Sequence, residues 1–140
     1  MSAGATILLV EDDPNDADLA MRSLRKSGLA AAVVHVEDGE GALAYLAAED
    51  GRRLPALVIL DLNLPRLHGL DVLREIRADQ RTRVLPVVVL TSSREERDLA
   101  AAYAHGANSF VCKPIPPDEF AAAARDIGAY WLLRNEVPRS

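Results

Sequence analysis

Leu57-Val58-Ile59-Leu60-Asp61 is the stretch that decides the fold, because four apolar residues run directly into one carboxylate. A second stretch of the same kind, Ile7-Leu8-Leu9-Val10, runs into Glu11-Asp12-Asp13. Short apolar runs separated by helix-patterned sequence are typical of buried parallel strands. Adjacent parallel strands end at one edge of the sheet, where ligands of open α/β folds bind. We therefore expect three or four carboxylates to converge there.

Such a cluster of carboxylates is unfavourable by itself. Two unit charges about 4 Å apart repel by roughly 4 kcal/mol at an effective dielectric constant of about 20. A bound cation offsets this repulsion. The sequence therefore predicts a divalent metal site beside one reactive aspartate, Asp61.

The rest of the chain alternates strand patterns with helix patterns. Strands are predicted near residues 6–10, 31–36, 56–60, 86–90 and 108–112, and helices near 14–26, 40–48, 70–76, 93–106 and 116–131. This order predicts an α/β fold, a doubly wound five-stranded parallel sheet with five helices on its two faces.

Several helix ends carry specific signals. Asp13 is predicted to cap the first helix, with Pro14 at its first position and Gly28 at its end. Gly51 is predicted to follow the second helix. The pattern Ser93-Arg94-Glu95-Glu96 predicts a capping box that opens the fourth helix.

Length and composition favour one domain, residues 1–140, with an extension of the last helix over about 128–140. A net charge of −5 argues against a nucleic-acid-binding surface. The one cysteine, Cys112, is expected to be a buried thiol and not a redox sensor, and a single cysteine fits the cytoplasm. No signal peptide or membrane span is expected.

Polar residues follow four of the predicted strands at the same edge. They are Glu11 and Asp12, then Asp61, Thr91 and Lys113. Each of them alone is more simply a helix or turn cap. Four coordinated positions on one fold favour a shared site.

These residues carry a resemblance to a known family. The segments are Leu8-Leu9-Val10-Glu11-Asp12-Asp13, Leu60-Asp61-Leu62-Asn63-Leu64-Pro65 followed by His68-Gly69, then Leu90-Thr91-Ser92 and Lys113-Pro114. In this order and spacing they resemble the receiver domain of two-component response regulators, over about residues 6–127. The resemblance implies a flavodoxin-like sheet with strand order 2-1-3-4-5.

The resemblance also implies roles for single residues. Asp61 would accept a phosphoryl group from a histidine kinase, and Lys113 would pair with the acidic site and later with the phosphate. Mg²⁺ would be held by Asp12, Asp61 and the backbone carbonyl of Asn63, with Glu11 acting through water. Oxygen ligands and the lack of a His/Cys cluster suit Mg²⁺ better than zinc.

The resemblance also implies a conformational switch. Thr91 would turn toward the phosphate and Phe110 would move inward, which would reshape the face made by helix 4, strand 5 and helix 5. As a plain core residue, Phe110 needs no such role. The Lys113–Pro114 bond is expected to be cis on the resemblance alone.

Three positions depart from the commoner family pattern. Glu11 replaces an aspartate, and Phe110 lacks the hydroxyl of the commoner tyrosine. His68 stands where many relatives have an acid, and we expect a solvated loop residue there with no metal or proton role.

The sequence disfavours two other functions. A dehalogenase-like phosphatase needs a second aspartate two residues after the nucleophile, and Asn63 occupies that position. A protein-binding module that acts without phosphorylation is disfavoured by the intact set of site residues. We therefore expect a phosphoacceptor and not an enzyme.

The last helix carries four successive bulky residues, Tyr130, Trp131, Leu132 and Leu133. They cannot all face one core across a helix of 3.6 residues per turn. We expect a dimer or partner interface there, with docking of the tail on its own domain as the alternative. No output domain is expected after this helix, so output would pass through protein contacts.

This ending resembles the single-domain regulators of bacterial phytochrome kinases. That resemblance implies a homodimer through helices 4 and 5 and a photoreceptor histidine kinase as phosphodonor. No nucleic acid and no membrane is expected as a direct partner.

Overall fold

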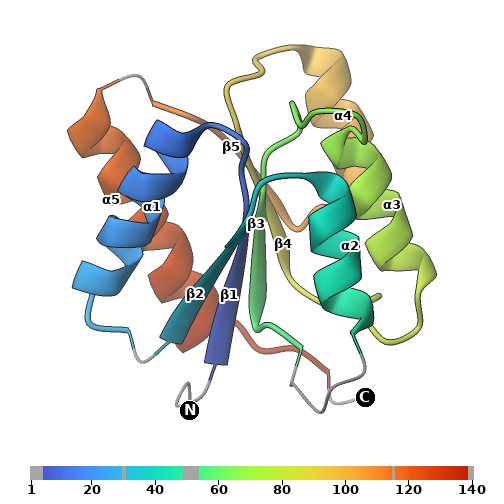
Figure 1. Ribbon diagram of the computed structural model, residues 1–140, viewed down its shortest axis with the longest axis horizontal. Helices are drawn as coiled ribbons and strands as arrows, with labels where there is room; N and C mark the ends of the chain where they lie inside the picture. The colour runs from blue at the N-terminus through green and yellow to red at the C-terminus, as the bar shows by residue number, and fades with distance from the viewer. Residues whose placement is uncertain (1–4, 30, 49–53, 115, 139–140) are drawn as a thin grey trace.

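The computed structural model describes residues 5–29, 31–48, 54–114 and 116–138. Five strands form one parallel sheet in the order β2-β1-β3-β4-β5 (Figure 1). The strands are β1 (Ala5–Val10), β2 (Ala31–Val36), β3 (Leu57–Leu60), β4 (Val87–Thr91) and β5 (Ser109–Cys112). The helices are α1 (Pro14–Lys26), α2 (Gly39–Ala47), α3 (Gly69–Ala78), α4 (Glu96–Ala104) and α5 (Pro117–Ala129). The predicted fold class and strand order are confirmed.

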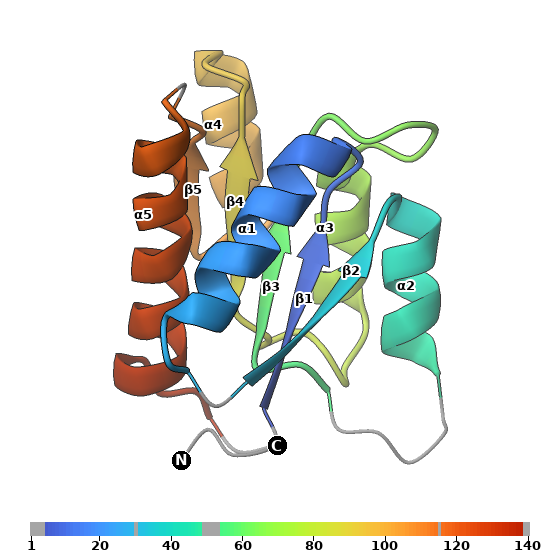
Figure 2. The same ribbon diagram turned by 60° about the vertical axis from the view of Figure 1, so that its left-hand side comes forward.

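Helices cover both faces of the sheet. Helices α1 and α5 lie together on one face, and α2, α3 and α4 lie on the other (Figures 1 and 2). Alternate residues of β3 face opposite sides of the sheet. Val58 and Leu60 pack toward α2, α3 and α4, whereas Leu57 and Ile59 pack toward α1 and α5. A strand buried on both faces has no polar side, so the central strands β1, β3 and β4 are nearly continuous apolar runs in the sequence.

The caps of α1 are as predicted. The Asp13 carboxylate accepts the backbone N–H groups of Asn15 and Asp16, and Pro14 begins the helix. Gly28, with φ of +83°, follows the C-cap, in the left-handed region that favours glycine. Helix α2 ends at Ala47, and Gly51 lies outside the described residues.

The capping box predicted at Ser93 is wrong. Helix α4 begins at Glu96 after Glu95, which makes no side-chain cap. The Ser93 hydroxyl contacts the Asp98 carboxylate at 2.5 Å and lies 3.4 Å from the backbone nitrogen of Glu95. These contacts hold residues 93–95 as a loop, so the N-cap comes two residues later than expected.

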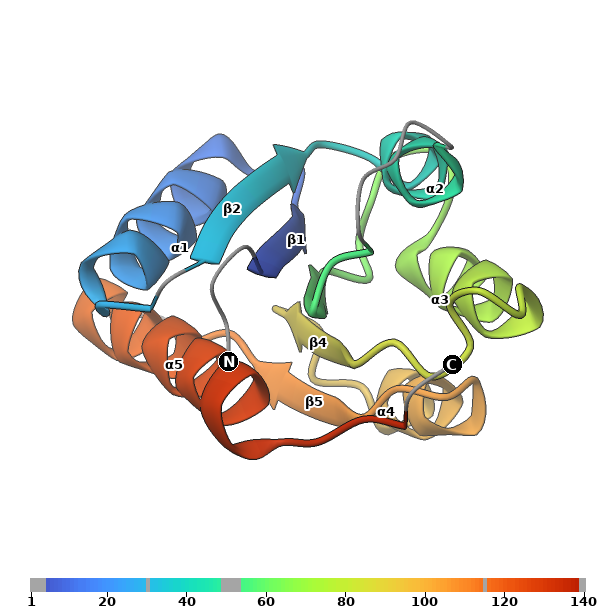
Figure 3. The same ribbon diagram turned by 90° about the horizontal axis from the view of Figure 1, so that it is seen from below.

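After α5 the chain continues as a π-helical turn over Tyr130–Arg134 and then crosses below the sheet toward α4 (Figure 3). Trp131 and Leu132 are partly buried and pack against the core beneath α1 and α5. Tyr130 and Leu133 are 52% and 60% exposed. The four bulky residues therefore do not share one core, as predicted. Whether the exposed pair binds a partner stays a prediction.

Within the described ranges, no helix combines the length and the apolar character needed to cross a membrane.

Candidate functional site

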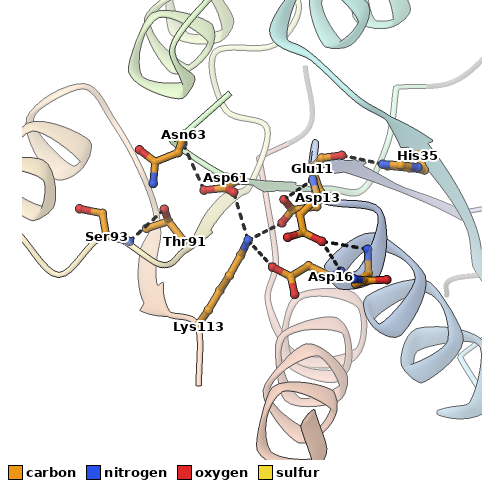
Figure 4. Close-up of polar contacts among 10 residues, drawn as sticks. Glu11, Asp13, Asp16, His35, Asp61, Asn63, Thr91, Ser93 and Lys113 are labelled. Carbon is orange, nitrogen blue, oxygen red and sulfur yellow. Dashed lines mark hydrogen bonds and ion pairs between the residues drawn. The ribbon is translucent and has the colours of Figure 1, made fainter. Parts of the chain in front are cut away.

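The predicted strand-end residues lie at the carboxyl edge of the sheet (Figure 4). Glu11 follows β1, Asp61 follows β3, Thr91 ends β4 and Lys113 follows β5. Parallel strands in register bring these positions together although the chain separates them widely. The expected convergence is therefore observed for these four side chains.

Lys113 lies at the centre of the site. Its ammonium nitrogen is 2.6 Å from Glu11 Oε1, 2.9 Å from Asp16 Oδ2 and 3.1 Å from Asp61 Oδ2. The Lys113 residue is only 8% exposed. A lysine ammonium has three N–H donors, so each donor has one carboxylate.

Hydrogen bonds hold both the backbone and the side chain of Asp61 in place. Its backbone N–H donates to the Val10 carbonyl at 3.1 Å, which continues the pairing of β1 with β3 beyond the end of β3. Its Oδ1 accepts the backbone N–H of Asn63 at 3.2 Å, while Oδ2 faces Lys113. Gly69 packs against this loop so closely that an added Cβ would lie 2.6 Å from Leu62 Cα. Only glycine fits there, and the start of α3 thereby holds the backbone of Asp61.

Glu11 is equally constrained. Its backbone N–H donates to Val36 O at 3.1 Å, and its carbonyl accepts the ring N–H of His35 at 2.7 Å. The carboxylate is shared, because Oε1 contacts Lys113 and Oε2 accepts the backbone N–H of Asp13 at 3.1 Å. The side chain of Glu11, one methylene longer than the commoner aspartate, thus contacts the ammonium group of Lys113.

Burial and neighbouring charge perturb both partners of this pair. Burial, with the charge of Asp61, raises the pKa of Glu11 from 4.5 to about 7, and the hydrogen bond from Lys113 opposes this rise. Burial alone lowers the pKa of Lys113, but Glu11, Asp61 and Asp16 outweigh it, so this pKa is raised above its ordinary value. The lysine thus stays charged, and in the absence of a metal it is the cation that offsets the acidic cluster.

The residues present fit a small divalent cation. Oxygen atoms of Glu11, Asp12 and Asp61 lie within 4.8 Å of one another. All three groups are carboxylates. Among the described residues, no histidine or cysteine belongs to this cluster. Asp12 and Asn63 are exposed at the mouth of the site, which leaves room for water ligands. Carboxylates with several waters are the ligands that Mg²⁺ prefers.

Thr91 ends β4 beside this cluster (Figure 4), and Phe110 lies in β5, where it is paired with Val89. Thr91 is fully buried and its hydroxyl accepts the backbone N–H of Ser93 at 3.3 Å. Phe110 is partly buried and packs on the core beneath α2, α3 and α4. Their roles in a switch stay predictions.

Pro114, Cys112 and His68 differ in part from what the sequence predicts. The prediction of a cis bond between Lys113 and Pro114 is wrong, because no peptide bond of the described residues is cis. The trans form is the intrinsically preferred one even before proline. Cys112 is half-buried and its thiol faces the Ser93 carbonyl at 3.5 Å. His68 is not simply solvated, since its Nδ1 accepts the backbone N–H of Leu70 at 3.1 Å and caps α3.

Asp16 is the site residue that the sequence analysis missed. It lies in the first turn of α1, and its carboxylate reaches Lys113 over a separation of 97 residues. An acid three residues after the N-cap Asp13 was the available signal. That position usually indicates only helix capping.

The family model of the response regulator receiver domain matches residues 7–125. This match covers most of the chain, and the fold and the acidic cluster agree with it. The chain therefore belongs to the receiver domain family of two-component response regulators.

Among individual proteins, the chain is 40% identical over 134 residues to the probable methanogenesis regulatory protein FilR2 of Methanothrix harundinacea, covering 94% of this chain and 86% of that one. It is 34% identical to the response regulator Rcp1 of Synechocystis sp., covering 94% and 92%. The crystal structure of the phosphorylated cyanobacterial phytochrome response regulator RcpA superposes with a TM-score of 0.90 at 35% identity, covering 96% and 99%. The Mn²⁺-bound form of Rcp1 superposes with a TM-score of 0.88 at 33% identity, covering the same shares.

Proposed function

We propose that this chain is a single receiver domain in which Asp61 accepts a phosphoryl group from the phosphohistidine of a histidine kinase. The observation that carries the proposal is the contact of Lys113 Nζ with Asp61 Oδ2 at 3.1 Å beside the Glu11, Asp12 and Asp61 oxygens. One carboxylate, one buried cation and a place for a second cation are what phosphoryl transfer to an aspartate requires.

In the reaction an Asp61 oxygen attacks the phosphorus, and the bond from phosphorus to the kinase histidine nitrogen breaks. The electron pair of that bond stays on the histidine. Asp12, Asp61 and the Asn63 carbonyl would hold Mg²⁺, with Glu11 acting through water. The metal would neutralise charge on the transferred group. Lys113 keeps Asp61 oriented before transfer and donates to a phosphoryl oxygen afterwards.

The switch uses Thr91 and Phe110. Phosphorylation replaces the −1 carboxylate of Asp61 with a group of charge about −1.5 to −2 that carries new acceptor oxygens. We propose that the Thr91 hydroxyl leaves the Ser93 N–H for a phosphoryl oxygen, and that Phe110 moves into the space released. The half-buried state of Phe110 supports this role, because a fully packed ring would have no second position.

The phosphorylation test uses acetyl phosphate with Mg²⁺. We expect the mass of the protein to increase by one phosphoryl group, and the modification to be lost in Asp61→Asn and without Mg²⁺. The matched control is Asp18→Asn, which removes an exposed acid whose ion-pair partner is Arg22 at 3.0 Å. Uptake by Asp61→Asn equal to that of the wild type would contradict the proposal.

The same samples separate the two alternatives. Multiple turnovers on small phosphate esters would indicate a phosphatase. Partner binding that neither phosphorylation nor Asp61→Asn changes would indicate a module that binds without phosphorylation.

For partners, we propose a histidine kinase as phosphodonor, with a bacterial phytochrome kinase as the first candidate. The relatives Rcp1 and RcpA support this choice, since RcpA is a phytochrome response regulator. We also propose a homodimer through α4 and α5 with Tyr130, Trp131, Leu132 and Leu133 in the interface. The exposure of Tyr130 and Leu133 supports it. A phosphotransfer profile against candidate kinases tests the first proposal, and sedimentation tests the second.

A further inference from the structure

The ammonium group of Lys113 has no free donor. Glu11, Asp16 and Asp61 lie at 2.6, 2.9 and 3.1 Å from it, and Figure 4 shows Asp16 and Asp61 approaching it from different sides. A phosphoryl oxygen that arrives on Asp61 therefore has to take the place of one existing acceptor, or share its donor.

Asp16 is available for this contact because of the local sequence around the N-cap of α1. In a capping box, the side chain at the third helical position accepts the backbone N–H of the N-cap residue. Here that N–H, from Asp13, is taken by Glu11 Oε2 at 3.1 Å. The carboxylate of Asp16 is thus released from capping and turns to Lys113 instead.

Asp16 also differs from the other two carboxylates on Lys113. Glu11 and Asp61 belong to the group of oxygens that fits a metal ion, whereas Asp16 does not. A divalent cation would offset the charge of Glu11 and Asp61. Asp16 would then remain the carboxylate whose charge is balanced by Lys113 alone.

We propose that Asp16 is a positioning residue for Lys113 that competes with the phosphoryl group for its ammonium, and so shortens the life of the phosphorylated state. This inference rests on the proposed function of Asp61. Phosphorylation makes the acceptor side chain more negative. Asp16 keeps one Lys113 donor and adds a repelling charge close to the phosphoryl group.

The step that Asp16 influences is hydrolysis. The oxygen of a water molecule attacks the phosphorus, and the bond from phosphorus to the Asp61 oxygen breaks. The products are inorganic phosphate, which carries the protons of the water, and the free Asp61 carboxylate. Loss of the phosphoryl group relieves its repulsion with Asp16 and returns the third donor of Lys113 to Asp61.

An acid in the first turn of a helix is favourable without any such role, because the helix dipole places partial positive charge there. A purely structural Asp16 would alter stability but leave the Lys113 ammonium unchanged. The test therefore needs a readout on the lysine itself.

The Lys113 ammonium can be observed directly, because the only lysines in the sequence are Lys26 and Lys113. Protein labelled with ¹⁵N in the lysine side chains gives two ammonium signals, with exposed Lys26 as the internal reference. We expect Asp16→Asn to shift the Lys113 signal and to leave the Lys26 signal in place. Asp18→Asn, a matched loss of one charge on α1, is expected to move neither. An unmoved Lys113 signal in Asp16→Asn contradicts the proposal, and this measurement needs no phosphorylation.

The second arm measures the decay of phosphoprotein after acetyl phosphate is removed. We expect Asp16→Asn to slow the loss of the phosphoryl group about 1.5- to fivefold, the range for one partly exposed charged contact. Asp16→Glu, which restores a carboxylate, is expected to return the rate toward that of the wild type. A decay in Asp16→Asn that is unchanged or faster overturns the proposal. Wild-type protein that takes up no phosphoryl group contradicts the proposed function itself.

Discussion

The buried carboxyl group of Glu11 is expected to make the metal-free protein less stable as the pH rises from about 4.5 to about 7. Its pKa is raised from 4.5 to about 7, by burial first and then by the charge of Asp61. The folded protein therefore binds this proton more tightly than the unfolded chain does. This contribution to stability is fully present below pH 4.5 and is lost as the pH rises through 7.

The size of the effect follows from the same shift. One pKa unit corresponds to about 1.4 kcal/mol, so the rise of Glu11 is worth roughly 3 kcal/mol. Water screens little of it, because Glu11 is only 4% exposed. The Lys113 ammonium, 2.6 Å away, favours the charged carboxylate and keeps the rise from being larger.

Urea unfolding of the wild type and of Glu11→Gln, with a metal chelator present and at several pH values from about 4.5 to 8, measures this contribution. Glutamine mimics the protonated acid, so the wild type should lose roughly 3 kcal/mol relative to the variant across this range and then level off. Exposed Glu37, which follows β2, provides the control variant Glu37→Gln. Added Mg²⁺ should reduce the difference above pH 6, because a bound cation offsets the charge of the carboxylate.

If wild type and Glu11→Gln differ by a constant amount between pH 4.5 and 7, to within about 1 kcal/mol, the Glu11 proton is not held more tightly in the folded state. The same slope in Glu37→Gln relative to the wild type would show that the effect is not specific to the site.

Three further predictions concern packing in the fold and assembly of the protein. Gly69→Ala should destabilise the protein by about 3 kcal/mol or more in urea unfolding, because the new Cβ would lie 2.6 Å from Leu62 Cα. It should also reduce phosphoryl uptake. Unchanged stability would contradict the close approach. Arg77→Ala should cost about 3 kcal/mol, because this half-buried guanidinium donates to four carbonyl oxygens and one side-chain oxygen. Exposed Arg74→Ala should cost at most about 0.5 kcal/mol, and equal losses would refute the distinction. Trp131→Ala should weaken the dimer in sedimentation, and an unchanged association constant would remove Trp131 from the interface.

Much of the fold was predictable because its signals are local. The apolar run Leu57–Leu60 needs no partner in the sequence to indicate a buried strand, and Asp13 caps the residues that follow it directly. The expected convergence of Asp61 and Lys113 followed from one general property, that parallel strands end at a common edge. Such features depend on neighbours in the chain or on the topology alone.

Other features depend on contacts that no local pattern contains. Ser93 had the pattern of a helix cap, but its contact with Asp98 holds it in a loop. Trp131 and Leu132 pack on the core while their neighbours Tyr130 and Leu133 stay exposed, a division set by where the π-helical turn leads the chain.

The sequence by itself determined the order of strands and helices and the carboxylates that gather at one edge of the sheet, since hydrophobic periodicity and strand ends are properties of short segments. Only the tertiary structure decided which acids hold Lys113. Asp16 reaches it across 97 residues because Glu11 already occupies the N–H that Asp16 would otherwise cap. A competition between side chains for one donor becomes visible only when all of them are placed in space.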